Sequence, residues 1–314
     1  MTLLTTKQAY RLMKRGLLAA RVGTEWRFER NALLRRASGA TEGSAESGAN
    51  TVAHAPRPKS MKLALLTFLL ALLCVAPASA EEARVAVASN FVQPMRALSE
   101  AFSKRTHHRT IVISGATGKL YAQVKNGAPF DVLLAADEKT PRAIEDEGLA
   151  ARGARFTYAV GKLVLYSAKP NFVDAEGEVL RAKRFEHLAV ANPKLAPYGS
   201  AAISVLKKLN LLEALEPKLA LGENIAQTLQ FVESGTAELG FVAWSQVLNA
   251  GKPRAGSFWV VPEHLYPPIR QDAVLLRKAE GNGAARAFID FLRSDVARRL
   301  IAEAGYVLPP KTDP

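Results

Sequence analysis

Short apolar runs alternate with amphipathic stretches through most of the chain beyond residue 83. In four places an apolar strand pattern leads into a loop of small residues and then into residues with helical periodicity. This recurrence predicts α/β layers in which the strands are mainly parallel. The four segments are VAVASNFVQPM (85–95), IVISGATGKLYAQV (111–124), LAVANPKLAPYGSAA (188–202) and KLALGENIAQTLQFV (218–232).

The loops of these four segments hold the candidate binding groups. Each loop places backbone N–H groups at the start of a helix, where the helix dipole favours an anion. Four such helix ends meeting in a cleft would bind an anion without a metal or a charged side chain. Ser89, Asn90 and Tyr198 also have structural interpretations, as helix caps or as a partly buried aromatic ring. The candidate donors are Ser89, Asn90, Thr117, Tyr198 and Ile225.

Two further apolar segments predict how the large C-terminal part is organised. GKLVLYSA (161–168) reads as a strand that crosses into a second lobe, and IRQDAVLLRKA (269–279) reads as the returning strand. Two crossings predict a two-stranded hinge with the ligand between the lobes. We expect lobe 1 to comprise residues 81–163 and 270–314, and lobe 2 to comprise residues 164–269.

Residues 61–80, MKLALLTFLLALLCVAPASA, have the pattern of a secretory signal peptide. Lys62 provides the basic end, residues 63–76 form an apolar run, and Pro77 then breaks the helix. Small residues at 78–80 fit a cleavage site. The apolar run is short for a membrane span, so a transmembrane anchor is the weaker alternative.

The N-terminal segment TTKQAYRLMKRGLLAARVGTEWRFERNALLRRA (5–37) predicts a helix, a strand pair and a second helix. It resembles the later two-thirds of excisionase-type, MerR-like helix-turn-helix domains, without their first helix. Residues 38–60 are rich in Gly, Ser and Ala and read as a disordered linker. A DNA-binding head conflicts with an export signal. Three arrangements remain open: translation from Met61, a true fusion anchored by an uncleaved segment, or an extension without function.

Charge and residue chemistry exclude several function classes. Residues 1–80 hold 12 Lys/Arg and 4 Asp/Glu, whereas residues 81–314 hold 30 and 25, so the larger part lacks the charge of a nucleic-acid binder. The single cysteine, Cys74, excludes a disulfide framework. No histidine has a setting typical of a nucleophile–base pair, and no His/Asp/Glu group has metal-ligand spacing. We therefore expect neither an enzyme nor a metal-cation site.

Several motifs carry a resemblance to a known family. They are ASNF, SGATGKLYAQVKNGAPFDVLLAAD, PYGSAA, GEN-AQTLQFVESG-AELGFVA and the GYVLP tail. Over residues 83–310 the chain resembles the periplasmic molybdate-binding proteins of ABC transporters. This resemblance implies a type II periplasmic binding fold, in which a tetrahedral oxyanion lies between two α/β lobes and is held by neutral donors.

The resemblance also implies which residues contact the ligand. By position, the contacts of the family fall on Ser89, Asn90, Thr117, Tyr198 and Ile225. Many members carry a ligand-binding tyrosine where this chain has Ala243. Tyr198 stands where those members have a small residue, so we expect Tyr198 to supply the missing hydroxyl.

The function implied is that of a monomeric periplasmic receptor for molybdate or tungstate, with an ABC permease and ATPase as partners and no cofactor. Rigid donors sized for a large oxyanion would leave sulfate with stretched hydrogen bonds. They would also penalise phosphate, whose remaining proton needs an acceptor. The alternative function is a molybdate-responsive regulator that binds DNA through residues 5–37.

Overall fold

The computed structural model describes residues 19–22, 25–28, 80–249 and 251–310 of the chain. The chain divides into two compact units, residues 1–75 and 76–314. In the first unit, strands β1 (Ala19–Val22) and β2 (Glu25–Phe28) form an antiparallel pair. This pair confirms the strand pair expected within residues 5–37. The helices expected beside it, the linker and almost all of the export signal lie outside the described residues.

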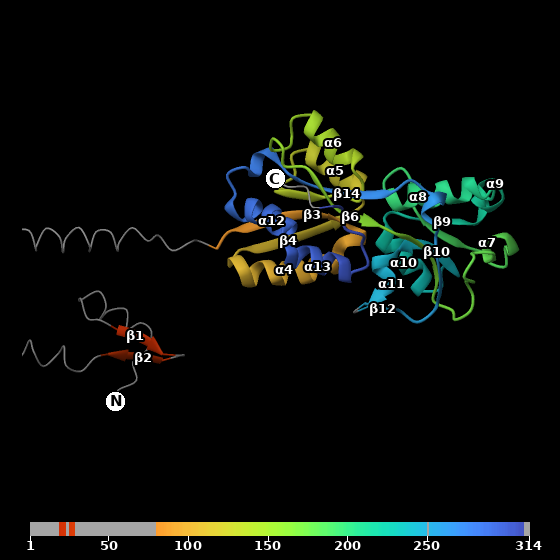
Figure 1. Cartoon of the computed structure of the whole chain (residues 1–314), viewed down its shortest axis with the longest axis horizontal. Coiled ribbons are helices and arrows are strands. Elements are labelled where there is room, and N and C mark those ends of the chain that lie inside the picture. Colours follow the sequence, from red (N-terminus) through yellow and green to blue (C-terminus); the bar gives the residue numbers. More distant parts are fainter. Residues whose placement is uncertain (1–18, 23–24, 29–79, 250, 311–314) are drawn as a thin grey trace, which may run out of the picture. The chain divides into compact units, whose positions relative to one another are not determined.

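The second unit contains two five-stranded sheets, each flanked by helices (Figure 1). We call each sheet with its helices a lobe. The sheet of lobe 1 has the order β4 (Arg109–Gly115), β3 (Glu82–Ala88), β5 (Val132–Leu134), β14 (Ile269–Leu275) and β6 (Phe156–Gly161). The sheet of lobe 2 has the order β13 (Ser257–Val260), β7 (Leu163–Ser167), β10 (Leu239–Ala243), β8 (Leu188–Ala191) and β9 (Leu219–Gly222).

The sheets are mixed, which corrects the expectation of mainly parallel strands. In lobe 1, β3 pairs in parallel with β4 and β5, but β14 is antiparallel to both β5 and β6. In lobe 2, β8 is parallel to β9 and β10, whereas β7 is antiparallel to β10 and β13. The antiparallel strands are those next to the crossings between the lobes. Strands β6 and β13 are not among those expected from the sequence, and without them the parallel pattern dominates.

Alternate residues of the central strands pack on opposite faces of the lobe 1 sheet. Val85 and Val87 of β3 belong to one buried cluster with Phe288, whereas Ala86 between them belongs to another with Leu120. A strand buried on both faces therefore needs helices on both sides. On one side lie α4 (Val92–Thr106), α12 (Gly283–Arg293) and α13 (Asp295–Glu303); on the other lie α5 (Thr117–Lys125) and α6 (Lys139–Asp146).

Lobe 2 follows the same rule. Leu188 and Val190 of β8 pack into one cluster with α8, while Ala189 packs into another with α10. The first face carries α7 (Val179–Ala182), α8 (Pro197–Lys208) and α9 (Leu212–Leu215), and the second carries α10 (Ile225–Glu233) and α11 (Trp244–Val247). The short elements are η1 (Ser89–Phe91), η2 (Glu216–Lys218), η3 (Glu263–Leu265), η4 (Arg277–Ala279), β11 (Leu248–Asn249) and β12 (Lys252–Pro253).

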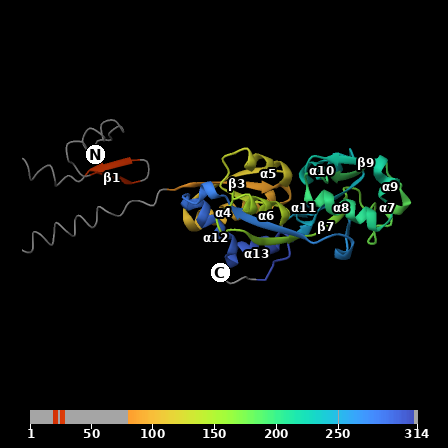
Figure 2. The same cartoon turned by 90° about the horizontal axis from the view of Figure 1, so that it is seen from above.

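The chain passes between the lobes twice (Figures 1 and 2). It first crosses at Lys162, between β6 and β7, and it returns over residues 261–268, between β13 and β14. The C-terminal tail lies against β6, since Val307 bridges to Val160. None of the helices in the described ranges combines the length and apolar character that a bilayer crossing requires.

Candidate functional site

All five candidate donors line one small pocket at the junction of the lobes. The pocket has a volume of about 10 Å³, close to the space that one water molecule needs. Each of the five residues is at most 9% exposed. Its walls come from the ends of β3, β4 and β5 and from the starts of α5, α8 and α10. The lining residues are Ala88, Ser89, Asn90, Gly115, Ala116, Thr117, Ala136, Ala196, Pro197, Tyr198 and Ile225, and none is charged.

The start of α10 leaves one backbone donor without a partner in its own helix. Asn224 caps this helix, and its side-chain oxygen accepts from the N–H groups of Ala226 (2.9 Å) and Gln227 (3.1 Å). The N–H of Thr228 bonds to the Asn224 carbonyl. Of the first-turn donors, only the N–H of Ile225 remains, and Ile225 lines the pocket.

The start of α8 places Tyr198 in the same pocket. Pro197 occupies the first turn, where its missing N–H costs nothing, and the N–H groups of Gly199 and Ser200 bond to the Ala196 carbonyl. The backbone N–H of Tyr198 is the donor of this turn that has no acceptor within the helix. Gly199 is required here, because a β carbon would collide with the carbonyl oxygen of Ala191.

The start of α5 contributes the hydroxyl of Thr117. Its oxygen accepts a 3.1 Å hydrogen bond from the backbone N–H of Ala136, so the hydroxyl proton is free to donate in another direction. The neighbouring Gly118 N–H donates to the Leu195 carbonyl of lobe 2 at 2.9 Å. This bond holds the two lobes together beside the pocket.

Ser89 and Asn90 lie on η1 after β3, and they differ in what they can offer. The Ser89 hydroxyl has no hydrogen-bond partner in the described part of the chain. Asn90 has two groups that could donate to a ligand, its side-chain amide and its backbone N–H. The amide instead donates to Gln271 and Tyr306, both at 2.9 Å. Asn90 can therefore offer the pocket its backbone N–H rather than its amide.

A buried polar network lies behind the pocket and connects the lobes. Gln271 of β14 is fully buried; its amide oxygen accepts from Asn90, and its Nε2 donates to the Tyr198 hydroxyl at 3.0 Å. Tyr158 of β6 also lies 3.1 Å from the Gln271 oxygen. Ser245 of lobe 2 donates to the Asn90 carbonyl at 3.1 Å. Every polar group of this network contacts another, as burial requires.

Three tyrosines of this network remain protonated. Burial raises the pKa of Tyr306 to about 12, and it raises the pKa values of Tyr158 and Tyr198 well above the usual value. The first cause in each case is desolvation, which disfavours the charged phenolate. The hydroxyls therefore act as neutral donors and acceptors throughout the physiological pH range.

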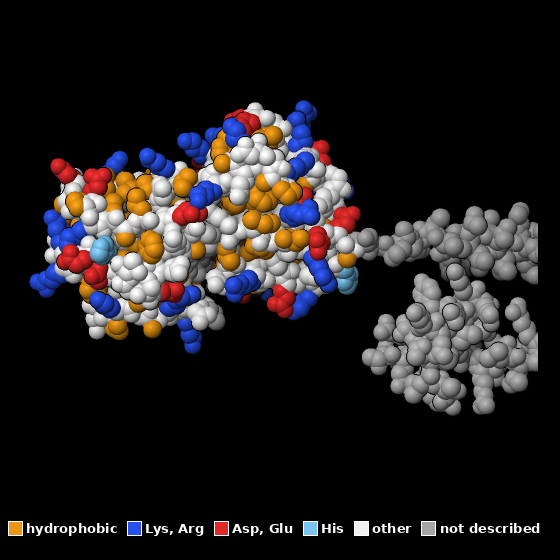
Figure 3. All heavy atoms as spheres, turned by 180° about the vertical axis from the view of Figure 1, so that it is seen from behind, with side chains coloured by type: hydrophobic (Ala, Val, Ile, Leu, Met, Phe, Trp, Pro, Cys, Tyr) orange, Lys and Arg blue, Asp and Glu red, His pale blue; other side chains and the backbone are white. Residues whose placement is uncertain are grey.

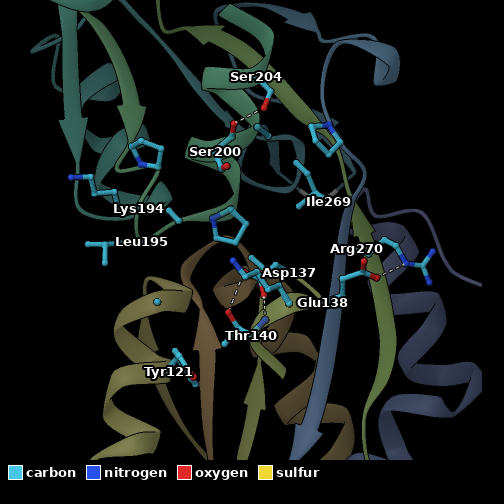
Figure 4. A pocket seen from close by; sticks show the side chains of 18 of the residues that line it. Tyr121, Asp137, Glu138, Thr140, Lys194, Leu195, Ser200, Ser204, Ile269 and Arg270 are labelled. Atoms are coloured by element: carbon cyan, nitrogen blue, oxygen red, sulfur yellow. Dashed lines mark hydrogen bonds and ion pairs between the residues drawn. The ribbon is translucent and has the colours of Figure 1, made fainter. Parts of the chain in front are cut away.

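A larger groove of about 530 Å³ lies beside the pocket, between the lobes (Figure 4). Tyr121 and Thr140 of lobe 1 face Lys194 and Leu195 of lobe 2 across it. Its walls carry acidic and basic side chains together, so it differs from the pocket, whose lining residues are all uncharged. The charged residues of the groove are Asp137, Glu138, Lys139, Lys194 and Arg270. Partial burial raises the pKa of Asp137.

Lys119 faces neither cavity. It pairs with Glu223 of lobe 2 at 2.7 Å, and both side chains are about half exposed. Together with the Gly118–Leu195 hydrogen bond, this ion pair forms a contact at the rim that joins α5 to lobe 2. Among the described residues, no group of three or more His, Cys, Asp or Glu side chains could hold a metal ion.

Sequence reasoning did not identify the polar network. Gln271 lies between Arg270 and Asp272 at the start of β14, so the local pattern does not single it out, although it is fully buried. Tyr306 lies 216 residues from its partner Asn90, and Ser245 lies 155 residues away. No local pattern predicts contacts of that separation.

Comparisons with known proteins agree with this architecture. Residues 83–307 match the model of a family described as bacterial extracellular solute-binding protein. The chain is 53% identical over 244 residues to the molybdate-binding protein ModA of Azotobacter vinelandii, covering 78% of this chain and 97% of that protein. It is 45% identical over 250 residues to ModA of Rhodobacter capsulatus, covering 80% and 98%. The solved periplasmic molybdate-binding protein of A. vinelandii superposes with a TM-score of 0.71 at 41% identity, covering 72% of this chain and 99% of that one.

Proposed function

Because the chain belongs to the family of bacterial extracellular solute-binding proteins, we propose that it captures molybdate between its lobes for an ABC importer. The observation that carries this proposal is the neutral pocket, in which several helix starts and hydroxyls converge and no charged side chain takes part. Two relatives of high identity are named as molybdate-binding proteins. The proposed contacts are Ser89, Asn90, Thr117, Tyr198 and Ile225.

Neutral donors can supply enough binding free energy. A hydrogen bond to a charged partner contributes about 1.5–3 kcal/mol, and a helix start adds about 0.3–1 kcal/mol. About five such donors give on the order of 10 kcal/mol before the costs of association, which is compatible with micromolar or tighter binding. The burial of the pocket strengthens each of these interactions, since water does not compete for them.

The same geometry favours particular oxyanions. A donor ring held by helix starts cannot contract onto a smaller tetrahedron, so sulfate would be bound through longer hydrogen bonds than molybdate or tungstate. Phosphate carries a proton at neutral pH and would need an acceptor. We propose molybdate or tungstate as ligand, and a permease with its ATPase as the partners that receive it.

Thermal unfolding of the exported protein tests this function. Molybdate at 100 times its dissociation constant should stabilise the folded state by about 2.7 kcal/mol and raise the melting temperature by several degrees. Sulfate and phosphate at the same concentration serve as controls and should change it far less. A melting temperature that none of these oxyanions shifts would refute the proposal.

We also propose that residues 61–80 direct export and are removed after Ala80. The support is the basic, apolar and small-residue order of this segment. The family match starts at residue 83, directly beyond the proposed cleavage site. Cleavage there would free the two-lobed unit from everything upstream, including the strand pair β1–β2.

Export is checked by N-terminal sequencing of the protein recovered outside the cytoplasm after expression of all 314 residues. The expected first residue is Glu81. The same measurement addresses the regulator alternative, because a cytoplasmic protein that retains residues 5–37 would be required for DNA binding. Recovery of the uncleaved chain in the cytoplasm alone would contradict the proposed export.

A further inference from the structure

Gln271 contacts a candidate ligand residue of each lobe, Asn90 and Tyr198. We propose that Gln271 is a positioning residue that fixes the Tyr198 hydroxyl as a proton donor toward the pocket, and thereby makes the site selective for fully deprotonated oxyanions. This inference rests on the proposed function for the ligand class. It adds the residue that decides whether the Tyr198 hydroxyl donates a hydrogen bond to the pocket or accepts one from it. We call this direction the polarity of the site.

The first step concerns the orientation of the Gln271 amide. The Tyr306 hydroxyl donates to the carbonyl oxygen of Asn90 at 3.0 Å, so its oxygen is left to accept from Asn90 Nδ2 at 2.9 Å. Asn90 Nδ2 also lies 2.9 Å from Gln271 Oε1. An NH₂ group can only donate, so the Gln271 oxygen must face Asn90.

The second step follows from that orientation. With its oxygen toward Asn90, Gln271 turns its NH₂ group toward Tyr198, and Nε2 donates to the Tyr198 oxygen at 3.0 Å. A phenol has a single proton, and this proton cannot return to the group that already donates to it. The Tyr198 proton is therefore directed away from Gln271.

Two acceptors then compete for the Tyr198 proton. One is the Tyr306 oxygen, since a hydrogen bond from Tyr198 contributes to the pKa of Tyr306. The other is an oxyanion in the pocket that Tyr198 lines. A dianion accepts a stronger hydrogen bond than a neutral hydroxyl does, so the ligand takes the proton when it is present.

Packing fixes the position of the Tyr198 side chain beside Gln271. A β carbon at Gly161 would collide with the Tyr198 hydroxyl and would lie 2.7 Å from Gln271 Nε2. The backbone of β6 therefore closes directly over the pair, and Tyr198 is only 1% exposed. The hydroxyl keeps its place, and only its hydrogen-bond direction can change.

The polarity has a consequence for specificity. An oxyanion without protons can accept from Tyr198, Thr117 and Ser89 at once. A protonated oxyanion such as hydrogen phosphate must place its own hydroxyl against one of these donors, and it loses that hydrogen bond. Gln271 thus influences ligand selection without touching the ligand.

The substitution Gln271→Glu tests the proposal through its pH profile. In its protonated form, the introduced carboxyl group presents an oxygen to Asn90 and an O–H to Tyr198, which preserves the wild-type polarity. In its ionised form, the carboxylate accepts at both oxygens, so the Tyr198 proton turns toward it and the pocket loses a donor. Because burial raises the pKa of a carboxyl group, this change is expected to fall between about pH 6 and 9.

The readout is the dissociation constant for molybdate, measured by isothermal titration calorimetry at several pH values. For the wild type we expect a change of less than about twofold between pH 6 and 9. For Gln271→Glu we expect affinity near that of the wild type at pH 6 and a loss of about 10- to 100-fold at pH 9, the size of one hydrogen bond to a charged ligand. Two flat, coinciding profiles would overturn the proposal.

A double-variant comparison separates polarity from simple charge repulsion. In a Tyr198→Phe background there is no hydroxyl to turn, so the additional loss caused by Gln271→Glu at pH 9 should be clearly smaller. An equal loss in both backgrounds would mean that the negative charge alone acts, and the proposal would be wrong. If the wild type binds no oxyanion at all, the proposed function fails instead.

Two more variants complete the design. Gln271→Met has a similar length and no charge; it should weaken molybdate binding at every pH and reduce the preference for molybdate over phosphate, and an unchanged affinity and preference would refute the proposal. Arg270→Gln alters the preceding residue of β14, whose side chain pairs with Glu138 outside the network (Figure 4). It should behave as the wild type does.

Discussion

At the scale of single residues, the hydroxyls of Ser89 and Thr117 on the lobe 1 side of the pocket differ in their hydrogen bonds. Ser89 has no hydrogen-bond partner among the described residues, whereas Thr117 accepts from the buried Ala136 N–H. Both are placed to donate to a ligand. Only Thr117 also satisfies a group of the protein itself, so the two residues should respond differently to removal of the hydroxyl.

We predict that Ser89→Ala lowers molybdate affinity by roughly 10- to 100-fold and leaves the stability of the ligand-free protein nearly unchanged. Thr117→Val should lower affinity similarly and should also reduce the free energy of unfolding by about 1–3 kcal/mol, because the Ala136 N–H loses its acceptor. Calorimetric titration and denaturant unfolding measure the two quantities. Equal losses of stability in both variants would contradict this division of roles.

At the scale of helices and strands, the sequence predicts well what is local. In α4, Met95, Leu98 and Phe102 follow helical spacing in the sequence, and all three are fully buried. Such elements can be predicted because helical periodicity, and the pattern of a strand buried on both faces, depend on residues close together in the sequence. The starts of α5, α8 and α10 were identified for the same reason.

The sequence predicts poorly what depends on distant partners. Strands β6 and β13 pair with segments that lie far away along the chain, and their residues alternate too weakly to be recognised alone. By its position in the sequence, the Asn90 amide could contact a ligand or another protein group. Only the structure shows that it already donates to Gln271 and Tyr306. The location of the candidate pocket could thus be predicted, but not the network that orients it.

At the scale of the whole molecule, the described residues carry basic and acidic side chains in similar numbers. Figure 3 shows Lys and Arg side chains intermixed with Asp and Glu on the face that it presents. This agrees with 30 basic and 25 acidic residues in positions 81–314. That face therefore shows no basic patch of the kind that binds nucleic acid.

The buried tyrosines predict how the stability of the molecule depends on pH. The pKa of Tyr306 is about 12 in the folded state, above the value of about 10 in an unfolded chain. A raised pKa gives stability that is complete below pH 10 and is lost as the pH rises to about 12, because the unfolded chain releases its proton first. The free energy of unfolding should therefore fall over this window.

Denaturant unfolding at about pH 9 to 11.5 measures this effect, with Tyr306→Phe as the control. The variant should lose less stability across the window, by up to about 1.4 kcal/mol per pH unit, since it lacks one titrating group. Identical slopes for the two proteins would contradict the assignment. Between about pH 6 and 9 no side chain that lines the pocket changes charge, so molybdate affinity should be nearly constant over this range.

The rim contact between α5 and lobe 2 has a consequence for transport. The Gly118–Leu195 hydrogen bond and the Lys119–Glu223 ion pair use only protein groups, so they stabilise the lobe arrangement of this structure whether or not a ligand is bound. If the protein binds its ligand in this arrangement, its population before binding lowers the conformational cost of capture. For the proposed transport function, a membrane partner that recognised only this arrangement of the lobes would also accept the protein without its ligand.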